Sequence, residues 1–188
     1  MGLYEPDRYF SSLTRIDVEW DLMRQGLTHV FLDVDNTIRR RDNDEIPPAV
    51  RSWLAKARDR GLSLCLLSNN FHNDIYDLAR ELDLPVVAKA MKPLPFGFRR
   101  AMKMLDATST SSVMVGDQLL TDVVGAHGVG MKAYLVRPLV DVDLKHTVVM
   151  RRVEERLLRE KTPQGDPLPG PSTCTVSEEV RGFDIEQD

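Results

Sequence analysis

The sequence has few cysteines, no long apolar run and no excess of basic residues. Its two cysteines, Cys65 in an apolar run and Cys174 in a polar stretch, argue against a disulfide framework. No segment reaches the roughly 20 consecutive apolar residues of a membrane span. The net charge of −4 and the pI near 5.6 exclude the basic footprint of a nucleic-acid-binding protein.

We also expect no secretory leader. The N-terminus has no basic segment followed by an apolar one. We therefore expect a cytoplasmic protein, with peripheral contact at the inner face of a membrane as the alternative. The sequence leaves the oligomeric state open.

What the sequence does contain is an alternation of short apolar runs and amphipathic segments. Its 188 residues suit a single domain. The strands that we expect are 29–33, 62–67, 86–88, 113–115 and 133–136. The helices that we expect between them are 47–61, 74–82, 96–105 and 120–126. Strands that alternate with single helices indicate an α/β fold, in which helices cover both faces of a parallel sheet.

The two ends of the chain differ from this core. Residues 1–27 carry an apolar stripe at approximately helical spacing, so we expect a helical extension that packs on the sheet. The alternative is a helix that touches a membrane surface. Residues 161–188 are rich in proline, glycine, serine and acids, so we expect a disordered acidic tail. The expected domain is therefore 1–160. The stripe consists of Tyr9, Phe10, Leu13, Ile16, Trp20 and Met23.

Two carboxylates stand at the end of the first expected strand. Asp33 and Asp35 follow the apolar run directly, and Thr37 comes two residues later. The carboxyl edge of an open α/β sheet is where ligands bind. Two acids so close together repel each other unless a cation or a shared proton lies between them. This pattern indicates a metal site, an acid–base pair or both.

Polar residues also follow the other expected strands. The second strand is followed by Ser68, and the fourth by Asp117, with Asp122 five residues later. Lys92 lies before the helix that follows the third strand. Because the carboxyl ends of parallel strands share one edge, these side chains can converge. A carboxylate nucleophile, a hydroxyl, a lysine and Mg²⁺ held by acids are the groups that phosphoryl transfer needs.

These motifs together resemble those of the haloacid dehalogenase (HAD) superfamily. Within it, the chain is most similar to the capless YqeG-type phosphatases of subfamily IIIA and the related phosphatidylglycerophosphate phosphatases. The resemblance covers residues 3–158 and implies a Rossmann-like three-layer sandwich with a central parallel sheet and no cap domain. The motifs are Asp33-Val34-Asp35-Asn36-Thr37, Ser68-Asn69-Asn70, Lys92-Pro93 and Gly116-Asp117 through Asp122.

The resemblance also implies roles for the acids. Asp33 would be the nucleophile that forms an aspartyl-phosphate, and Asp35 would be the general acid and base. Asp33, Asp35 and Asp117 would hold Mg²⁺, Asp35 through its backbone carbonyl. Asp122 would lie behind these ligands or orient Lys92.

The same resemblance implies a set of residues around the phosphate. The implied phosphate-binding residues are Thr37, Ser68, Asn69 and Lys92. Lys92 would also take part in catalysis by neutralising the nucleophile and the phosphate. Thr37 would also support the loop that carries the acids.

The expected substrate is a phosphomonoester on a large molecule. The gaps from Thr37 to Pro47 and from Ser68 to Lys92 are too short for a folded cap, so the site would be open. With the resemblance, this favours a phosphatidylglycerophosphate phosphatase-like enzyme that acts on a lipid at the membrane surface. The alternatives are a phosphatase for a nucleotide, a sugar phosphate or a phosphoprotein, and a non-catalytic phosphate-binding scaffold.

Three consecutive arginines, Arg39 to Arg41, follow the first motif. The simplest interpretation of such a run is a solvated charged surface. The alternative is a basic lip that receives an anionic headgroup or a membrane.

Overall fold

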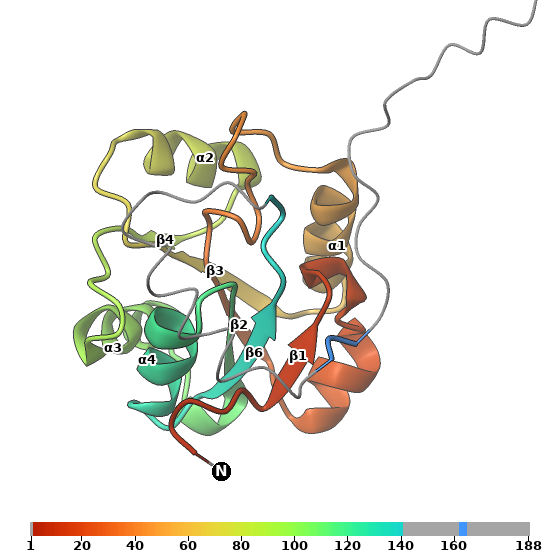
Figure 1. Ribbon diagram of the computed structural model, residues 1–188, viewed down its shortest axis with the longest axis vertical. Helices are drawn as coiled ribbons and strands as arrows, with labels where there is room; N and C mark the ends of the chain where they lie inside the picture. The colour runs from red at the N-terminus through yellow and green to blue at the C-terminus, as the bar shows by residue number, and fades with distance from the viewer. Residues whose placement is uncertain (1, 141–161, 165–188) are drawn as a thin grey trace, which may run out of the picture.

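A six-stranded parallel β-sheet forms the centre of the molecule (Figure 1). The computed structural model describes residues 2–140 and 162–164. The strand order is β1-β6-β5-β2-β3-β4, and every neighbouring pair is parallel. The strands are β1 (Arg8–Phe10), β2 (His29–Leu32), β3 (Ser63–Leu67), β4 (Val86–Val87), β5 (Ser112–Gly116) and β6 (Lys132–Val136).

Helices cover both faces of this sheet and complete three layers (Figure 1). Successive strand residues point to opposite faces. In β2, Val30 and Leu32 join the core beneath α1 and α2, whereas Phe31 joins the core beneath α3 and α4. The predicted α/β sandwich is therefore confirmed. The helices are α1 (Pro48–Asp59), α2 (Asp74–Leu82), α3 (Pro95–Met104) and α4 (Val124–His127).

The predicted strands and helices are present, with small shifts at their ends. Helix α1 begins at a proline, whose fixed φ suits a first helical turn. It ends just before Gly61, whose φ of +83° stops the helix. The fourth predicted helix begins as a π-turn, η5 (Leu119–Val123), before it continues as α4.

The N-terminal segment is not the predicted helix. Residues 8–10 form β1, which pairs with the open edge of β6. Asp17 then accepts hydrogen bonds from the backbone of Glu19 and Trp20, which starts a separate turn. The turns that follow β1 are η1 (Leu13–Arg15), η2 (Val18–Leu22) and η3 (Met23–Gln25), of which η2 is a π-turn and the others are 3-10 turns.

The apolar side chains of this segment do not form one stripe. Leu13, Ile16 and Leu22 are buried in the core, whereas Trp20 is 61% exposed. The reason is that β1 and three short turns replace the single helical axis on which the predicted spacing depends. The indole N–H of Trp53 in α1 donates to the carbonyl of Ile16 at 2.7 Å and ties the segment to this helix.

Gln164 lies beside β1. Its N–H donates to the carbonyl of Tyr9 at 2.8 Å, and its carbonyl accepts from the N–H of Ser11 at 2.9 Å. Gln164 belongs to the predicted disordered tail, but it pairs with β1, because the free edge of this strand offers backbone groups that need partners. The predicted domain end at residue 160 and the rest of the predicted tail lie outside the described residues, and they stay predictions.

The sheet order determines where a ligand can bind. The chain places β3 and β4 on one side of β2, and β5, β6 and β1 on the other. Leu32 of β2 is in register with Val115 of β5, and the N–H of Asp33 donates to the Val115 carbonyl at 2.9 Å. The residues that follow β2 and β5 therefore emerge side by side at a topological switch point, where open α/β sheets bind ligands.

The described part of the chain places no cap domain over this edge. Residues 38–47 form a loop, and residues 69–91 hold only α2, β4 and their connections. None of the helices in the described ranges is long and apolar enough to cross a bilayer.

Candidate active site

Four buried charged residues meet at the carboxyl edge of the sheet: Asp33, Lys92, Asp117 and Asp122. Each is at most 8% exposed. Asp33 and Asp117 follow β2 and β5, Lys92 precedes α3, and Asp122 lies in η5. The Lys92 ammonium donates to Oδ1 of Asp33 at 2.5 Å and to Oδ1 of Asp122 at 2.7 Å. The structure thus brings together three acids and a lysine from four separate positions in the sequence.

Three carboxylates face this lysine. Oxygens of Asp33, Asp117 and Asp122 all lie within 4.8 Å of one another. Burial raises the pKa of Asp33 to about 7, where Lys92 opposes the rise and Asp122 adds to it. Burial and the charges of Asp33 and Asp122 raise the pKa of Asp117 well above its usual range. Burial would lower the pKa of Lys92, but the carboxylates of Asp122 and Asp33 outweigh it and hold that pKa above its usual value.

This cluster suits a hard divalent cation. Carboxylate oxygens are the ligands that Mg²⁺ prefers, and a cation would relieve the repulsion that raises the pKa of Asp33 and Asp117. Asp33 and Asp117 are the candidate ligands. Asp122 is already engaged, because its two oxygens accept from Lys92 and from the N–H of Gln118 at 3.1 Å.

Gly116 makes room for the carboxylate of Asp122. A Cβ at position 116 would lie 2.2 Å from Oδ2 of Asp122, which is far inside van der Waals contact. Only glycine can therefore end β5 while Asp122 reaches Lys92. The Gly-Asp pair of the fourth motif has a steric cause as well as a chemical one.

Asn69 clamps the backbone of Lys92. Its side-chain oxygen accepts from the N–H of Lys92 at 2.7 Å, and its amide nitrogen donates to the Lys92 carbonyl at 3.1 Å. The amide of Asn69 thus holds the lysine in place, and the expected contact of Asn69 with phosphate stays a prediction. Ser68 before it is fully buried, and its hydroxyl accepts from the N–H of Asn70 at 3.0 Å.

The loop after β2 presents unpartnered polar atoms. Asn36 has a φ of +68°, and its N–H donates to the carbonyl of Arg39 at 2.8 Å. Among the described residues, the hydroxyl of Thr37 and both side-chain polar atoms of Asn36 are buried and have no hydrogen-bond partner. Buried polar groups without partners are rare in proteins, so these atoms are available to a ligand.

Asp35 is directed at Arg39. The guanidinium of Arg39 donates to Oδ1 of Asp35 at 2.9 Å and to Oδ2 of Asp74, the first residue of α2, at 2.7 Å. Asp35 is the half-buried acid of the pair, and Arg39 is 7% exposed. The expected general acid is therefore more exposed than the four clustered residues, and an arginine holds its carboxylate.

The interpretation of the arginine run as a solvated surface is wrong for Arg39, which is buried and pairs with Asp35 and Asp74. The alternative, a basic lip for an anionic headgroup or a membrane, stays a prediction. Arg40 pairs with Asp42 at 2.7 Å, and the charge of Arg41 partly opposes the rise that burial, Asp33 and Asp122 cause in the pKa of Asp117. The sequence did not reveal the role of Arg39, because its partner Asp74 comes near only once α2 has packed.

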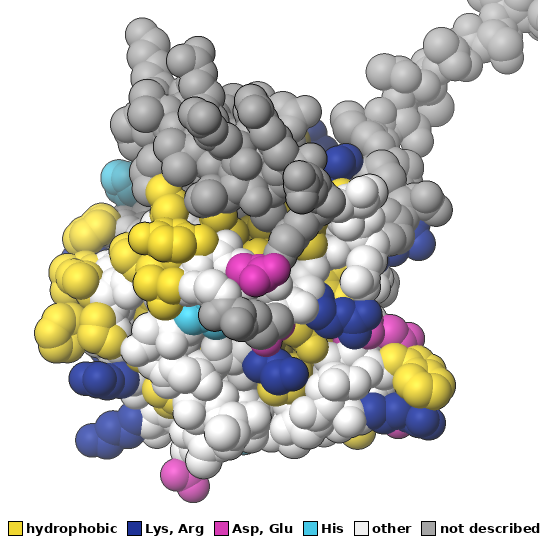
Figure 2. All heavy atoms as spheres, turned by 60° about the horizontal axis from the view of Figure 1, so that its bottom comes forward, with side chains coloured by type: hydrophobic (Ala, Val, Ile, Leu, Met, Phe, Trp, Pro, Cys, Tyr) yellow, Lys and Arg dark blue, Asp and Glu magenta, His cyan; other side chains and the backbone are white. Residues whose placement is uncertain are grey.

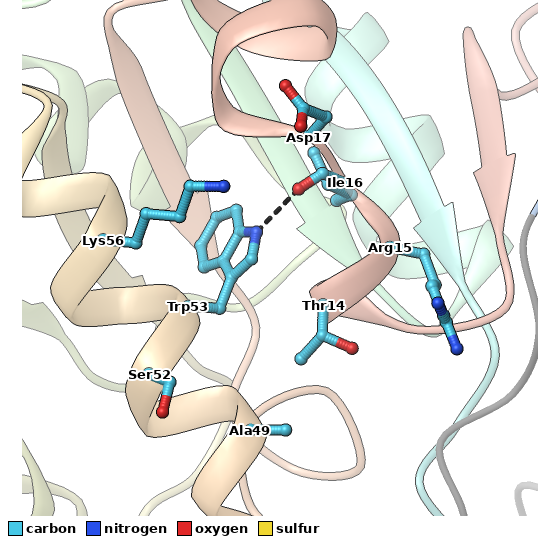
Figure 3. A pocket seen from close by; sticks show the side chains of 8 residues that line it. All are labelled: Thr14, Arg15, Ile16, Asp17, Ala49, Ser52, Trp53 and Lys56. Carbon is cyan, nitrogen blue, oxygen red and sulfur yellow. Dashed lines mark hydrogen bonds between the residues drawn. The ribbon is translucent and has the colours of Figure 1, made fainter.

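A separate hollow of about 370 Å³ lies between η1 and α1 (Figure 3). None of the four clustered residues lines it, and we assign it no role. Its lining consists of Thr14, Arg15, Ile16, Asp17, Ala49, Ser52, Trp53 and Lys56.

Comparison with known proteins decides the family. Residues 90–138 match the HAD-hydrolase-like family model. Over 153 residues the chain is 30% identical to the probable phosphatase YqeG of Bacillus subtilis, which covers 81% of this chain and 88% of that protein. The chain belongs to the HAD-like phosphatases.

This HAD phosphatase also has a more distant curated relative. It is 26% identical over 153 residues to phosphatidylglycerophosphate phosphatase 1, chloroplastic/mitochondrial, of Arabidopsis thaliana, over 76% of this chain and 44% of that protein. The crystal structure of an uncharacterized protein from Corynebacterium glutamicum matches the HAD phosphatase with a TM-score of 0.50 and 22% identity. That match covers 68% of this chain and 93% of the other. This last likeness shows a shared fold.

Proposed function

We propose that this HAD phosphatase is a Mg²⁺-dependent phosphomonoesterase that works through an aspartyl-phosphate on Asp33. The observation that carries the proposal is the Lys92–Asp33 ion pair inside a cluster of three buried carboxylates. Asp33 and Asp117 would hold the metal, together with the backbone carbonyl of Asp35. Bound Mg²⁺ would neutralise the acids and the phosphate, so that an anionic nucleophile can approach an anionic ester.

In the proposed reaction, Asp33 is the nucleophile and Asp35 transfers the protons. An oxygen of Asp33 attacks phosphorus, the bond to the leaving oxygen breaks, and Asp35 gives that oxygen a proton. Water then attacks the aspartyl-phosphate and passes a proton to Asp35, which restores both acids and releases phosphate. Lys92 holds Asp33 in position, and Thr37 and Ser68 would bind the phosphate oxygens.

The favoured substrate is a lipid phosphomonoester of the phosphatidylglycerophosphate type, and we infer a cytoplasmic enzyme that meets it at the membrane. The support is the name of the Arabidopsis relative and the open edge at which Asp33 and Asp35 lie. An uncapped edge admits a phosphate that stays attached to a large assembly.

Turnover of p-nitrophenyl phosphate tests the chemistry. We expect Mg²⁺-dependent release of nitrophenol that chelation abolishes and added Mg²⁺ restores. Asp33→Asn should remove turnover with an unchanged circular dichroism spectrum, while the matched control Asp59→Asn, at an exposed acid that ends α1, should stay active. Turnover by Asp33→Asn would refute the nucleophile, and phosphate binding without turnover by the native chain would favour a scaffold.

A panel of phosphate esters tests the proposed lipid substrate. Phosphate release from vesicles that contain phosphatidylglycerophosphate is compared with release from a nucleotide, a sugar phosphate and a phosphopeptide at equal phosphate concentration. We expect the highest kcat/KM for the lipid. A higher value for any soluble ester would replace the proposed substrate and leave the proposed chemistry intact.

A further inference from the structure

Helix α3 has one buried face and one basic face. Phe98 and Ala101 are fully buried against the sheet. Residues at positions i, i+3, i+4 and i+7 lie along one side of a helix. The exposed residues with this spacing are Phe96, Arg99, Arg100 and Lys103.

The segment around α3 has a charge opposite to that of the whole chain. Residues 84–105 contain five lysines or arginines and no acid, although the net charge of the protein is −4. Within the described residues, Arg99, Arg100 and Lys103 form no ion pair with a carboxylate. Their charge is therefore not neutralised inside the described part of the molecule. Figure 2 shows dark blue and yellow side chains gathered at its left, the side on which Figure 1 draws α3.

Large apolar side chains are exposed next to this basic stripe. Met91 is 50% exposed, Leu94 49% and Phe71 63%, and Phe96 at the start of α3 is 64% exposed. The N–H of Leu94 donates to the Met91 carbonyl at 2.9 Å, so these two residues share one turn. The ammonium of Lys89 lies 5.8 Å from the centre of the Phe71 ring, which places the two loops side by side.

These residues form what we call the α3 rim: Phe71, Lys89, Met91, Leu94, Phe96, Arg99, Arg100 and Lys103. The α3 rim adjoins the active site along the chain. Phe71 follows the Ser68 turn, and Met91 and Leu94 flank Lys92 and Pro93. Anything that binds the α3 rim is therefore held beside the phosphate-binding residues.

We propose that the α3 rim docks the enzyme on an anionic lipid bilayer. Exposed apolar side chains among lysines and arginines suit the interface of a membrane. The apolar side chains enter the headgroup region, and the lysines and arginines attract acidic lipids. A second copy of the chain fits less well, because a two-fold contact would place the same cations against one another. This inference rests on the proposed lipid substrate and names the surface that presents it.

Vesicle co-sedimentation tests the docking with the full chain and no substrate. We expect binding to phosphatidylcholine vesicles that contain phosphatidylglycerol, loss of binding at high salt, and weak binding to phosphatidylcholine alone. Arg99→Gln with Arg100→Gln should weaken binding about tenfold or more, since each cation near an anionic surface contributes separately. Leu94→Ser with Phe96→Ser should weaken it to a similar degree.

A matched control pair is available on another element. Trp20→Ser with Arg24→Gln removes an exposed aromatic residue and the guanidinium 3.9 Å above its ring, and vesicle binding should not change. All three double variants should hydrolyse p-nitrophenyl phosphate like the native chain. Native-like vesicle binding by both rim variants, or an equal loss in the control pair, would overturn the proposal. So would rim variants that alter self-association in solution and leave vesicle binding unchanged.

The two proposals fail in different ways. A native chain that binds anionic vesicles through the α3 rim but does not hydrolyse phosphatidylglycerophosphate supports docking and removes the proposed substrate. A native chain that hydrolyses this lipid with no contribution from the α3 rim overturns docking and keeps the substrate.

Discussion

Lys92 lies buried between the carboxylates of Asp33 and Asp122. Its replacement by methionine would leave several acids together without a compensating cation. We expect Lys92→Met to abolish turnover and, in metal-free buffer, to lower the free energy of unfolding by about 3–5 kcal/mol. Urea denaturation measures the second effect. Lys89→Met, at an exposed lysine three residues earlier, should leave the turnover of a soluble substrate and the free energy of unfolding unchanged. A stable Lys92→Met protein would show that the acids are protonated in the fold.

Arg39 donates to the proposed general acid, Asp35, and we expect it to act on the reaction through this contact. We expect Arg39→Ala to slow hydrolysis of an alkyl phosphate about tenfold more than that of p-nitrophenyl phosphate. The alkoxide needs a proton from a correctly held acid, whereas nitrophenolate leaves without one. The comparison of kcat for the two esters is the measurement. Arg40→Ala removes a neighbouring arginine that pairs with Asp42, and it should show no such difference. Equal losses for both esters would assign Arg39 a purely structural role.

At the scale of elements, the end of β5 and the turn η5 depend on each other. A methyl group at position 116 would collide with the Asp122 carboxylate, so Gly116→Ala should displace the partner of Lys92. We expect a loss of about 1–3 kcal/mol in stability and a clear drop in kcat. Thermal unfolding and p-nitrophenyl phosphate turnover measure the two effects. Gly128→Ala, whose added Cβ meets no atom closer than 3.3 Å, is the milder control. Full activity of Gly116→Ala would show that η5 can shift without cost.

The elements that could be predicted are those whose pattern is local. Strands β2, β3 and β5 are apolar runs, and α1 and α2 have apolar positions at helical spacing, so the sequence marks each of them. Strand β1 was not predicted, because its three residues form a strand only when they pair with β6. The turns after it were read as one helix, since spacing cannot show that Asp17 starts a new turn.

Within the site, too, some contacts follow from the topology and others depend on how distant segments pack. Acids that follow strands in a parallel sheet must share an edge, so the approach of Asp33 to Asp117 could be expected from topology alone. The contacts of Arg39 with Asp74 and of Asn69 with the backbone of Lys92 could not. They join segments far apart in the sequence, and their geometry depends on how α2 and the loop before α3 pack.

At the scale of the whole molecule, we expect the proposed metal site and the stability of the fold to be linked. Asp33 has an ordinary pKa of 3.8, which the fold raises to about 7. A folded state that holds this proton more tightly gains stability that is fully present below pH 4. That stability is lost as the pH rises through about 7. The metal-free protein should therefore melt at progressively lower temperature between these limits.

Differential scanning calorimetry of the metal-free protein from pH 4 to pH 8 measures this effect. Asp33→Asn cannot titrate, so the difference between its Tm and that of the native chain should change with pH in this window. Added Mg²⁺ should raise the Tm of the native chain most at pH 8, where Asp33 is ionised and must share space with Asp117 and Asp122. It should raise the Tm of Asp33→Asn much less. A Tm that is indifferent to Mg²⁺ at pH 8 would show that Lys92 alone compensates the carboxylates, and that no divalent cation belongs between them.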